Sequence, residues 1–136
     1  MKKKLIIIIA VVVVVVAGGI FAYMQLFSGN NEEPAEEQLT YFETGEYLVT
    51  NLKDENSLVK LTVVLGIPKD TDTAVLTEGI AAIRDRVVYV MRGHSKEDFA
   101  EQSSMDALSQ ELCQAINAEL GVDYVKRIYF YDFVIQ

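Results

Sequence analysis

The sequence predicts one membrane-spanning helix followed by one small α+β domain. Charge and hydrophobicity divide by position. Residues 1–27 hold 21 hydrophobic residues, three lysines and no acid, whereas residues 28–136 hold all 20 acids against nine basic residues, a net charge of −11. Within residues 40–136, stretches of strand-like alternation stand before and after stretches of helical spacing, which is the pattern of an α+β fold. About 100 residues can bury one core but leave no room for two substantial domains.

The first element is an uncharged run over residues 5–27. As a helix with about 1.5 Å of rise per residue, it reaches roughly 34 Å, enough to cross a hydrocarbon core of about 30 Å. Isoleucine and valine dominate the run, but in lipid every backbone group must bond within its own segment, which favours a helix. Lysines at positions 2–4 and none just after the run place residues 1–4 in the cytoplasm and the remainder outside.

The alternative for this segment is a cleaved signal peptide, with residues 17–19 as a small-residue cleavage site. Cleavage there would leave the apolar residues 20–24 as an unexplained start of the mature chain, so the sequence favours an uncleaved anchor. Both interpretations place the acidic part outside the cytoplasmic membrane.

Residues 28–39 are expected to be an acidic, flexible linker. This stretch has no apolar periodicity, and its four glutamates repel one another. We interpret it as a tether that holds the domain of residues 40–136 away from the lipid headgroups; a docking motif for a basic partner is the alternative.

The domain begins with one or two short strands over residues 40–52. Residues 59–67 then alternate apolar side chains in the clearest strand pattern of the chain, which Pro68 ends. From residue 73 to residue 91, apolar residues recur every three or four positions, which predicts a long helix that stops at Gly93. Residues 87–90 could instead form a strand.

A second helical region starts near Ser95, which could cap it, and its main apolar face runs from Leu108 to Leu120 before Gly121. Residues 122–136 are aromatic and β-branched throughout. Because both of its faces are apolar, we expect this last strand to lie in the centre of its sheet or between two layers.

No catalytic centre, cofactor site or metal site emerges from the sequence. His94 is the only histidine and is expected in an exposed turn, so histidine-based catalysis would depend on it alone. Cys113 is the only cysteine, which excludes an intrachain disulfide and a cysteine-based zinc site, and it is expected in the core. The acids near Asp70 and near Glu97 lack the spacing of a calcium loop and are explained by helix capping and solubility.

The acidic charge also disfavours partners with phosphate backbones, so nucleic acid is not an expected ligand. The sequence contains no Gly-rich phosphate loop and no nucleophile elbow, so it gives no indication of a small-molecule substrate. We expect a module of this kind to bind something or to assemble with itself.

At this point the order of motifs resembles the flagellar basal body-associated FliL family. The resemblance begins with a basic terminus, one span and an acidic tether. It continues with Thr50-Asn51-Leu52-Lys53-Asp54 before a strand, the arginine-centred helix Ile83-Arg84-Asp85-Arg86-Val87-Val88, and the helix start Lys96-Glu97-Asp98-Phe99. The last helix, with Leu108, Leu112, Ile116, Asn117 and Leu120, and the closing strand from Val125 to Gln136 complete it.

The resemblance implies a role rather than a reaction. It implies a stomatin/prohibitin-like (SPFH-like) domain, a place in the cytoplasmic membrane at the basal body, and association with the stator, the MotA/MotB ion-conducting complex. It also implies a homo-oligomeric ring, and no cofactor or small-molecule substrate. As candidate partner-interface residues we select Arg84 and Arg86, with Phe99 and Met105 as exposed apolar candidates. Asn117 is expected to cap or bridge within the fold.

Two other functions compete with a motor accessory protein. One is a secreted or tethered extracytoplasmic binding domain unrelated to the flagellum. The other is an extracytoplasmic hydrolase that uses the acid clusters, which would require two carboxylates to converge on a pocket.

Overall fold

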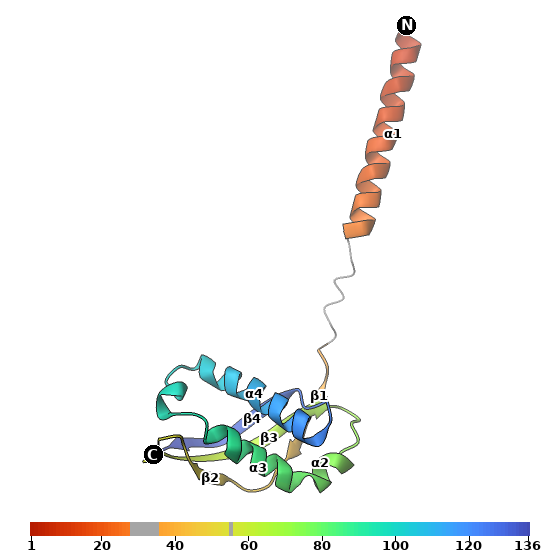
Figure 1. The fold of residues 1–136 in the computed structure, drawn as a ribbon. Helices are drawn as coiled ribbons and strands as arrows, with labels where there is room; N and C mark the ends of the chain where they lie inside the picture. The colour runs from red at the N-terminus through yellow and green to blue at the C-terminus, as the bar shows by residue number, and fades with distance from the viewer. Residues whose placement is uncertain (28–35, 55) are drawn as a thin grey trace. The chain divides into compact units, whose positions relative to one another are not determined.

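The computed structural model describes residues 1–27, 36–54 and 56–136. The chain forms two compact units, residues 1–36 and 37–136 (Figure 1). The expected linker over residues 28–39 lies mostly outside the described residues, and the first strand begins at Leu39.

Helix α1 (Lys2–Phe27) is the expected apolar helix. Residues 2–26 are long and apolar enough to cross a membrane. Side chains are exposed all around residues 1–26. A helix that is apolar on every side is suited to lipid rather than to water.

The domain contains one antiparallel sheet with β3 (Leu58–Pro68) at its centre. Strands β1 (Leu39–Glu43) and β2 (Leu48–Asn51) pair with the two ends of β3, at residues 64–68 and 58–61. Strand β4 (Arg127–Ile135) pairs with β3 over residues 59–66. Because a strand has only two edges, β1 and β2 lie end to end along one edge of β3 and β4 lies along the other.

The expectation that the last strand is central was wrong, because β3 is the one strand that pairs with β4 among the described residues. The apolar residues on the two faces of β4 have different surroundings. Ile128 and Phe130 face the core, whereas Tyr129 and Tyr131 face the opposite side, where Tyr131 is exposed. A tyrosine ring with a hydroxyl at its tip tolerates this partly solvent-exposed position.

Helices α2 (Ala74–Glu78) and α3 (Ile80–Met91) confirm the helical prediction for residues 73–91 and exclude a strand at residues 87–90. They form two helices rather than one because the chain breaks at Gly79. A Cβ atom on Gly79 would lie 2.9 Å from the backbone oxygen of Val75 and 2.6 Å from Leu120 Cδ2, so a side chain at this position would crowd the backbone of α2 as well as the end of the last helix.

The remaining helices are the short 3₁₀ helix η1 (Lys96–Phe99) and α4 (Ser103–Leu120). Ser95 forms a capping box with Asp98 at the start of η1, as its sequence indicates. Gly121 ends α4 in the left-handed conformation, with φ of 65°, which is the expected glycine stop.

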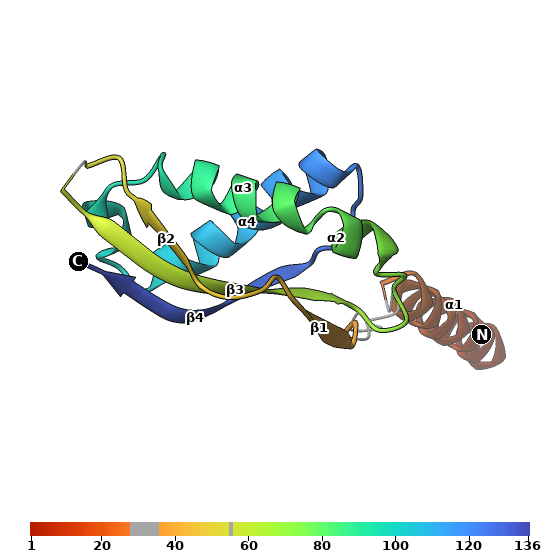
Figure 2. The same cartoon turned by 90° about the horizontal axis from the view of Figure 1, so that it is seen from below.

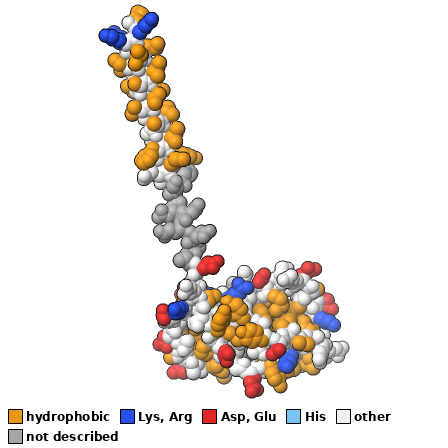
Figure 3. Space-filling view, turned by 180° about the vertical axis from the view of Figure 1, so that it is seen from behind, with side chains coloured by type: hydrophobic (Ala, Val, Ile, Leu, Met, Phe, Trp, Pro, Cys, Tyr) orange, Lys and Arg blue, Asp and Glu red, His pale blue; other side chains and the backbone are white. Residues whose placement is uncertain are grey.

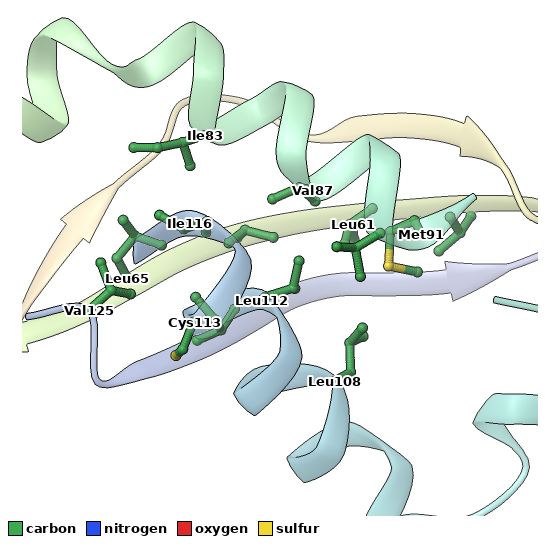
Figure 4. Packing of buried hydrophobic residues seen from close by; sticks show 14 of the residues in the cluster. Leu61, Leu65, Ile83, Val87, Met91, Leu108, Leu112, Cys113, Ile116 and Val125 are labelled. Atoms are coloured by element: carbon green, nitrogen blue, oxygen red, sulfur yellow. The ribbon is translucent and has the colours of Figure 1, made fainter. Parts of the chain in front are cut away.

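Helices α3 and α4 cover one face of the sheet, and the domain has two layers (Figure 2). The core lies between these layers (Figure 4). Its residues come from β3, from the two helices, and from the segment just before β4 and the start of that strand. Its labelled members are Leu61, Leu65, Ile83, Val87, Met91, Leu108, Leu112, Cys113, Ile116 and Val125. The predicted α+β class and the helix faces that supply the core are therefore confirmed.

Candidate functional site

Among the described residues, no group of three or more histidine, cysteine or acidic side chains is placed to hold a metal ion. Cys113 is buried on α4, as expected, and burial raises the pKa of its thiol. A buried thiol that stays protonated is a poor nucleophile. Cys113 therefore acts as a small core residue.

His94 lies in the expected turn, between α3 and η1, but two carboxylates enclose it. Its Nε2 lies 2.7 Å from Glu111 Oε2 on α4, and its Nδ1 lies 3.4 Å from Asp98 Oδ2. Both ring nitrogens thus face acids, which leaves neither one directed at a substrate. The arrangement joins α3, η1 and α4, and sequence reasoning missed Glu111 because it stands 17 residues away.

The carboxylate of Asp98 has a lowered pKa. The main cause is the hydrogen bond from the backbone N–H of Ser95, with smaller contributions from the Ser95 hydroxyl and from His94. These partners are those of a helix cap, so the acid supports the start of η1 rather than a reaction.

Arg84, the first of the candidate interface residues, is half-buried on α3. Its Nη1 donates hydrogen bonds to the carbonyl oxygens of Thr44 and Glu46, at 3.2 and 2.7 Å. Gly45, between them, has a φ of 103°, and a Cβ atom there would lie 3.3 Å from this nitrogen. Arg84 therefore fastens the turn between β1 and β2 to the helix layer.

Arg86 lies beside a groove between α3 and α4. Its Nη2 is 3.3 Å from Asp85 and its Nε is 3.7 Å from Glu119, while the guanidinium stands 4.5 Å from the Tyr89 ring centre. The Nε atom is buried, and no hydrogen-bond partner for it occurs in the described part of the chain. The groove has a volume of about 490 Å³ and also includes Val90, Glu111, Gln114, Ala115 and Ala118.

The two apolar candidates are less exposed than expected. Phe99 is half-buried and its ring packs against His94 and Phe133, each with centroids 5.4 Å apart. Met105 is also half-buried, in the first turn of α4. The two residues lie near the other end of the helix layer from Arg84, so the structure does not gather the four candidates into one site.

Sequence reasoning missed the exposed side chains on the sheet face opposite the helices. Tyr41 and Tyr131 are 66% and 55% exposed. Tyrosines that alternate with core residues in both edge strands were the available signal, because the period of two sends every other side chain away from the core.

The family model of the flagellar basal body-associated protein FliL matches residues 41–136. The chain belongs to the FliL family. The match runs from β1 to the last residue and so covers the whole two-layer domain. A comparison with curated proteins gave no match.

As a member of the FliL family, the protein is an accessory protein associated with the flagellar basal body and acts in motility. FliL proteins are not known as enzymes, and the apolar α1 fits a single-pass anchor in the inner membrane. The resemblance inferred from the order of motifs is thus confirmed.

Proposed function

We propose that this FliL-family protein associates with the ion-conducting stator complex of the MotA/MotB type and supports flagellar rotation, and with it swimming and swarming. The observation that carries the proposal is the family match over residues 41–136. It is supported by a domain that offers surfaces rather than a reacting centre in its described residues. In this proposal α1 crosses the inner membrane with residues 1–4 in the cytoplasm, and the acidic domain lies outside it.

The proposal also includes self-association of the domain, as a ring around the stator, and an SPFH-like relationship of the fold. A two-layer domain with an apolar face left uncovered by its own helices supports self-association. Ring closure requires a surface that repeats from one copy to the next.

Among the candidate interface residues, Arg86 is the best placed for a partner. It borders the groove between α3 and α4, and its side chain is 29% exposed there, beside Asp85, Glu119 and the Tyr89 ring, where a carboxylate or carbonyl group of a protein can approach the guanidinium. Phe99 and Met105 add apolar surface at the other end of the layer. Arg84 has its Nη1 engaged in the fold, so its share in a partner contact is expected to be smaller.

The test is a deletion strain complemented with the wild-type chain, Arg86→Ala or Arg92→Ala. Arg92 is an exposed arginine at the end of α3 and serves as the matched control. We expect Arg86→Ala to lower stator occupancy at the motor and swimming speed under viscous load, with Arg92→Ala close to wild type. Membrane fractionation checks that each variant is present in equal amount.

Unchanged stator occupancy and unchanged swimming under load in the deletion strain would reject the stator role. Recovery of a mature chain that starts near residue 20 in the soluble fraction would reject the membrane anchor. The two results are separate, because a cleaved chain could still act at the motor.

A further inference from the structure

The face of the sheet opposite α3 and α4 is an exposed surface of aromatic and aliphatic side chains. We call it the open face and define it by Tyr47 and the strand residues that alternate with core positions. Figure 3 views the molecule from behind and shows hydrophobic side chains gathered on the domain there. The members are Leu39, Tyr41, Glu43, Tyr47, Val49, Leu58, Lys60, Thr62, Val64, Arg127, Tyr129, Tyr131 and Val134.

The basic side chains of the open face lie beside tyrosine rings. Lys60 Nζ stands 4.4 Å from the centre of the Tyr47 ring, and the Arg127 guanidinium stands 5.5 Å from that of Tyr129. The Tyr129 ring also meets the Tyr41 ring edge to face, with centroids 5.2 Å apart. Within the described part of the chain, none of the ion pairs involves Lys60 or Arg127. The positive charge of both side chains is therefore available to an outside anion.

This composition is typical of protein surfaces at the level of lipid headgroups. Tyrosine is enriched at membrane–water interfaces, where its ring contacts apolar groups and its hydroxyl stays in water. Lysine and arginine lay their apolar stems along such surfaces and extend the charge towards the polar groups. The open face adds aliphatic side chains between these residues, with Val49, Leu58 and Val134 exposed by 55%, 42% and 46%.

The charge of the open face differs from that of the rest of the domain. Residues 28–136 carry a net charge of −11. The open face has two basic residues, Lys60 and Arg127, against Glu43, a net charge of +1. Apart from Glu43 and Asp132, the acids of the described domain lie outside the strands of the sheet. Since charges more than about 8 Å apart are largely screened at physiological ionic strength, lipid phosphates meet less repulsion at this face than the net charge indicates.

The connection to α1 keeps the open face within reach of a membrane. Eleven residues, 28–38, join Phe27 at the end of α1 to Leu39, which begins β1 and belongs to the open face. A chain of that length spans at most about 40 Å. The tether thus sets an upper limit to the distance and no lower limit. Because it raises the effective concentration of lipid at the open face, a weak contact is sufficient.

We propose that the open face lies on the lipid headgroup layer of the membrane that α1 crosses, with Lys60 and Arg127 at the lipid phosphates. The inference rests on the anchoring of α1 in the proposed function and does not depend on the stator role. Glu43 limits the contact to the headgroup layer, because a carboxylate is costly to bury in hydrocarbon.

Lipid suits the open face better than a second copy of the chain. In a ring around an axis normal to the membrane, neighbouring copies meet through their sides, and every copy turns the same face towards the lipid. Two open faces packed on each other would instead close a pair, which a ring does not contain. The flat face as a whole is therefore left for a different occupant.

The experiment uses tryptophan fluorescence, because the chain contains no tryptophan of its own. Tyr131→Trp places one at a position of the open face that is 55% exposed. The full chain is reconstituted into vesicles of phosphatidylethanolamine with a minority of phosphatidylglycerol, whose acyl chains are either ordinary or brominated near the headgroup. Bromine quenches only a tryptophan that touches the lipid. The matched control is Tyr89→Trp, since Tyr89 is 67% exposed but lies on α3 in the helix layer.

We expect brominated lipid to lower the emission of the Tyr131→Trp chain about twofold and to leave that of the Tyr89→Trp chain nearly unchanged. Equal quenching of the two would mean chance contact of a tethered domain and would overturn the proposal. The absence of quenching in both would also overturn it and would leave the open face to a protein partner. Tyr41→Trp is the second reporter on the same face, with the same expected result, if Tyr131→Trp does not fold.

A pair of charge reversals tests the basic residues, each combined with Tyr131→Trp. Lys60→Glu places a carboxylate on the open face and is expected to weaken the lipid contact, seen as reduced quenching, about fivefold or more. Lys96→Glu makes the same change in net charge on η1, in the helix layer, and is expected to leave the quenching unchanged. Equal losses from both would show that net charge alone controls the approach and would overturn the assignment to the open face. Unfolding midpoints like that of the parent confirm that both chains are folded.

These results are distinguishable from failure of the proposed function, because the vesicles contain no motor protein. Selective quenching of Tyr131→Trp, with stator occupancy unaffected by deletion of the gene, would reject only the stator role. Equal quenching of the two reporters, with stator occupancy lowered by the deletion, would reject only the lipid contact.

Discussion

Replacement of Asn117 by alanine tests how the last strand is joined to the helix layer. Asn117 lies in the last turn of α4. Its side-chain Nδ2 donates to the carbonyl oxygen of Val125, and its Oδ1 accepts from the N–H of Val125, both at 3.0 Å. Val125 is 2% exposed, so its backbone groups cannot turn to water when the amide is removed. This is the bridging role that the sequence predicts for Asn117.

The magnitude follows from the two groups left behind. A buried backbone group without a partner costs about 1–3 kcal/mol. Alanine regains about 0.5 kcal/mol of helix propensity relative to asparagine. We therefore expect Asn117→Ala to lower the free energy of unfolding by about 1.5–5.5 kcal/mol, and the lower end of that range corresponds to a decrease in Tm of roughly 6–12 °C for a domain of this size.

The assay is urea unfolding of the full chain in mild detergent, followed by circular dichroism. Gln114→Ala is the matched control, because Gln114 is exposed on the same helix and its loss is expected to change stability by less than about 0.5 kcal/mol. Asn117→Asp keeps the acceptor and loses the donor, so it should fall between the two. If Asn117→Ala destabilises no more than Gln114→Ala, the bridge to Val125 carries no stability and the reasoning is refuted.

Two further predictions concern the core and the capping box. Leu112→Ala removes a side chain with 0% exposure from the centre of the core. It should lower the free energy of unfolding by about 3–5 kcal/mol in the same assay, and a decrease of less than about 1 kcal/mol would contradict the packing. Because the pKa of Asp98 is lowered from 3.8, its stabilising effect is present above that value and is lost as the pH falls through the lower folded-state pKa. The difference in Tm between wild type and Asp98→Asn should therefore be present at pH 7 and shrink below pH 3.8, and a difference that does not change with pH would contradict the role of the charge.

Much of the fold was predictable from local patterns. The faces of α3 and α4, the strand at β3 and the glycine stop at Gly121 each follow from spacing or backbone preference within a few residues. The close approach of Leu120 to Gly79 was not predictable in this way, because Leu120 lies about 40 positions further along the chain and no local pattern contains it.

The place of β4 illustrates a second limit. An apolar run on both faces indicates burial on both faces only when the outer side chains find a cover. In β4 the outer side chains include Tyr129 and Tyr131, whose side of the sheet is covered by none of the domain's own described helices. Sequence patterns report the affinity of side chains for an apolar neighbour, but they do not report whether that neighbour belongs to the same chain.

The candidate interface residues also show that the sequence does not report which distant part of the chain a polar side chain contacts. Arg84 and Arg86 stand two positions apart on one helix and look equivalent in the sequence. The structure separates them, because Arg84 Nη1 bonds two backbone carbonyls of the turn between β1 and β2, whereas Arg86 borders an open groove. Which arginine serves the fold depends on a turn about 40 residues away.

The two surfaces of the domain differ in chemistry and lie on opposite layers. The groove between α3 and α4 combines Arg86 with acids and small residues, whereas the sheet face opposite the helices exposes the tyrosines Tyr41 and Tyr131. Because the two surfaces lie on opposite layers, the domain can hold one contact through the sheet and another through the helices without competition between them.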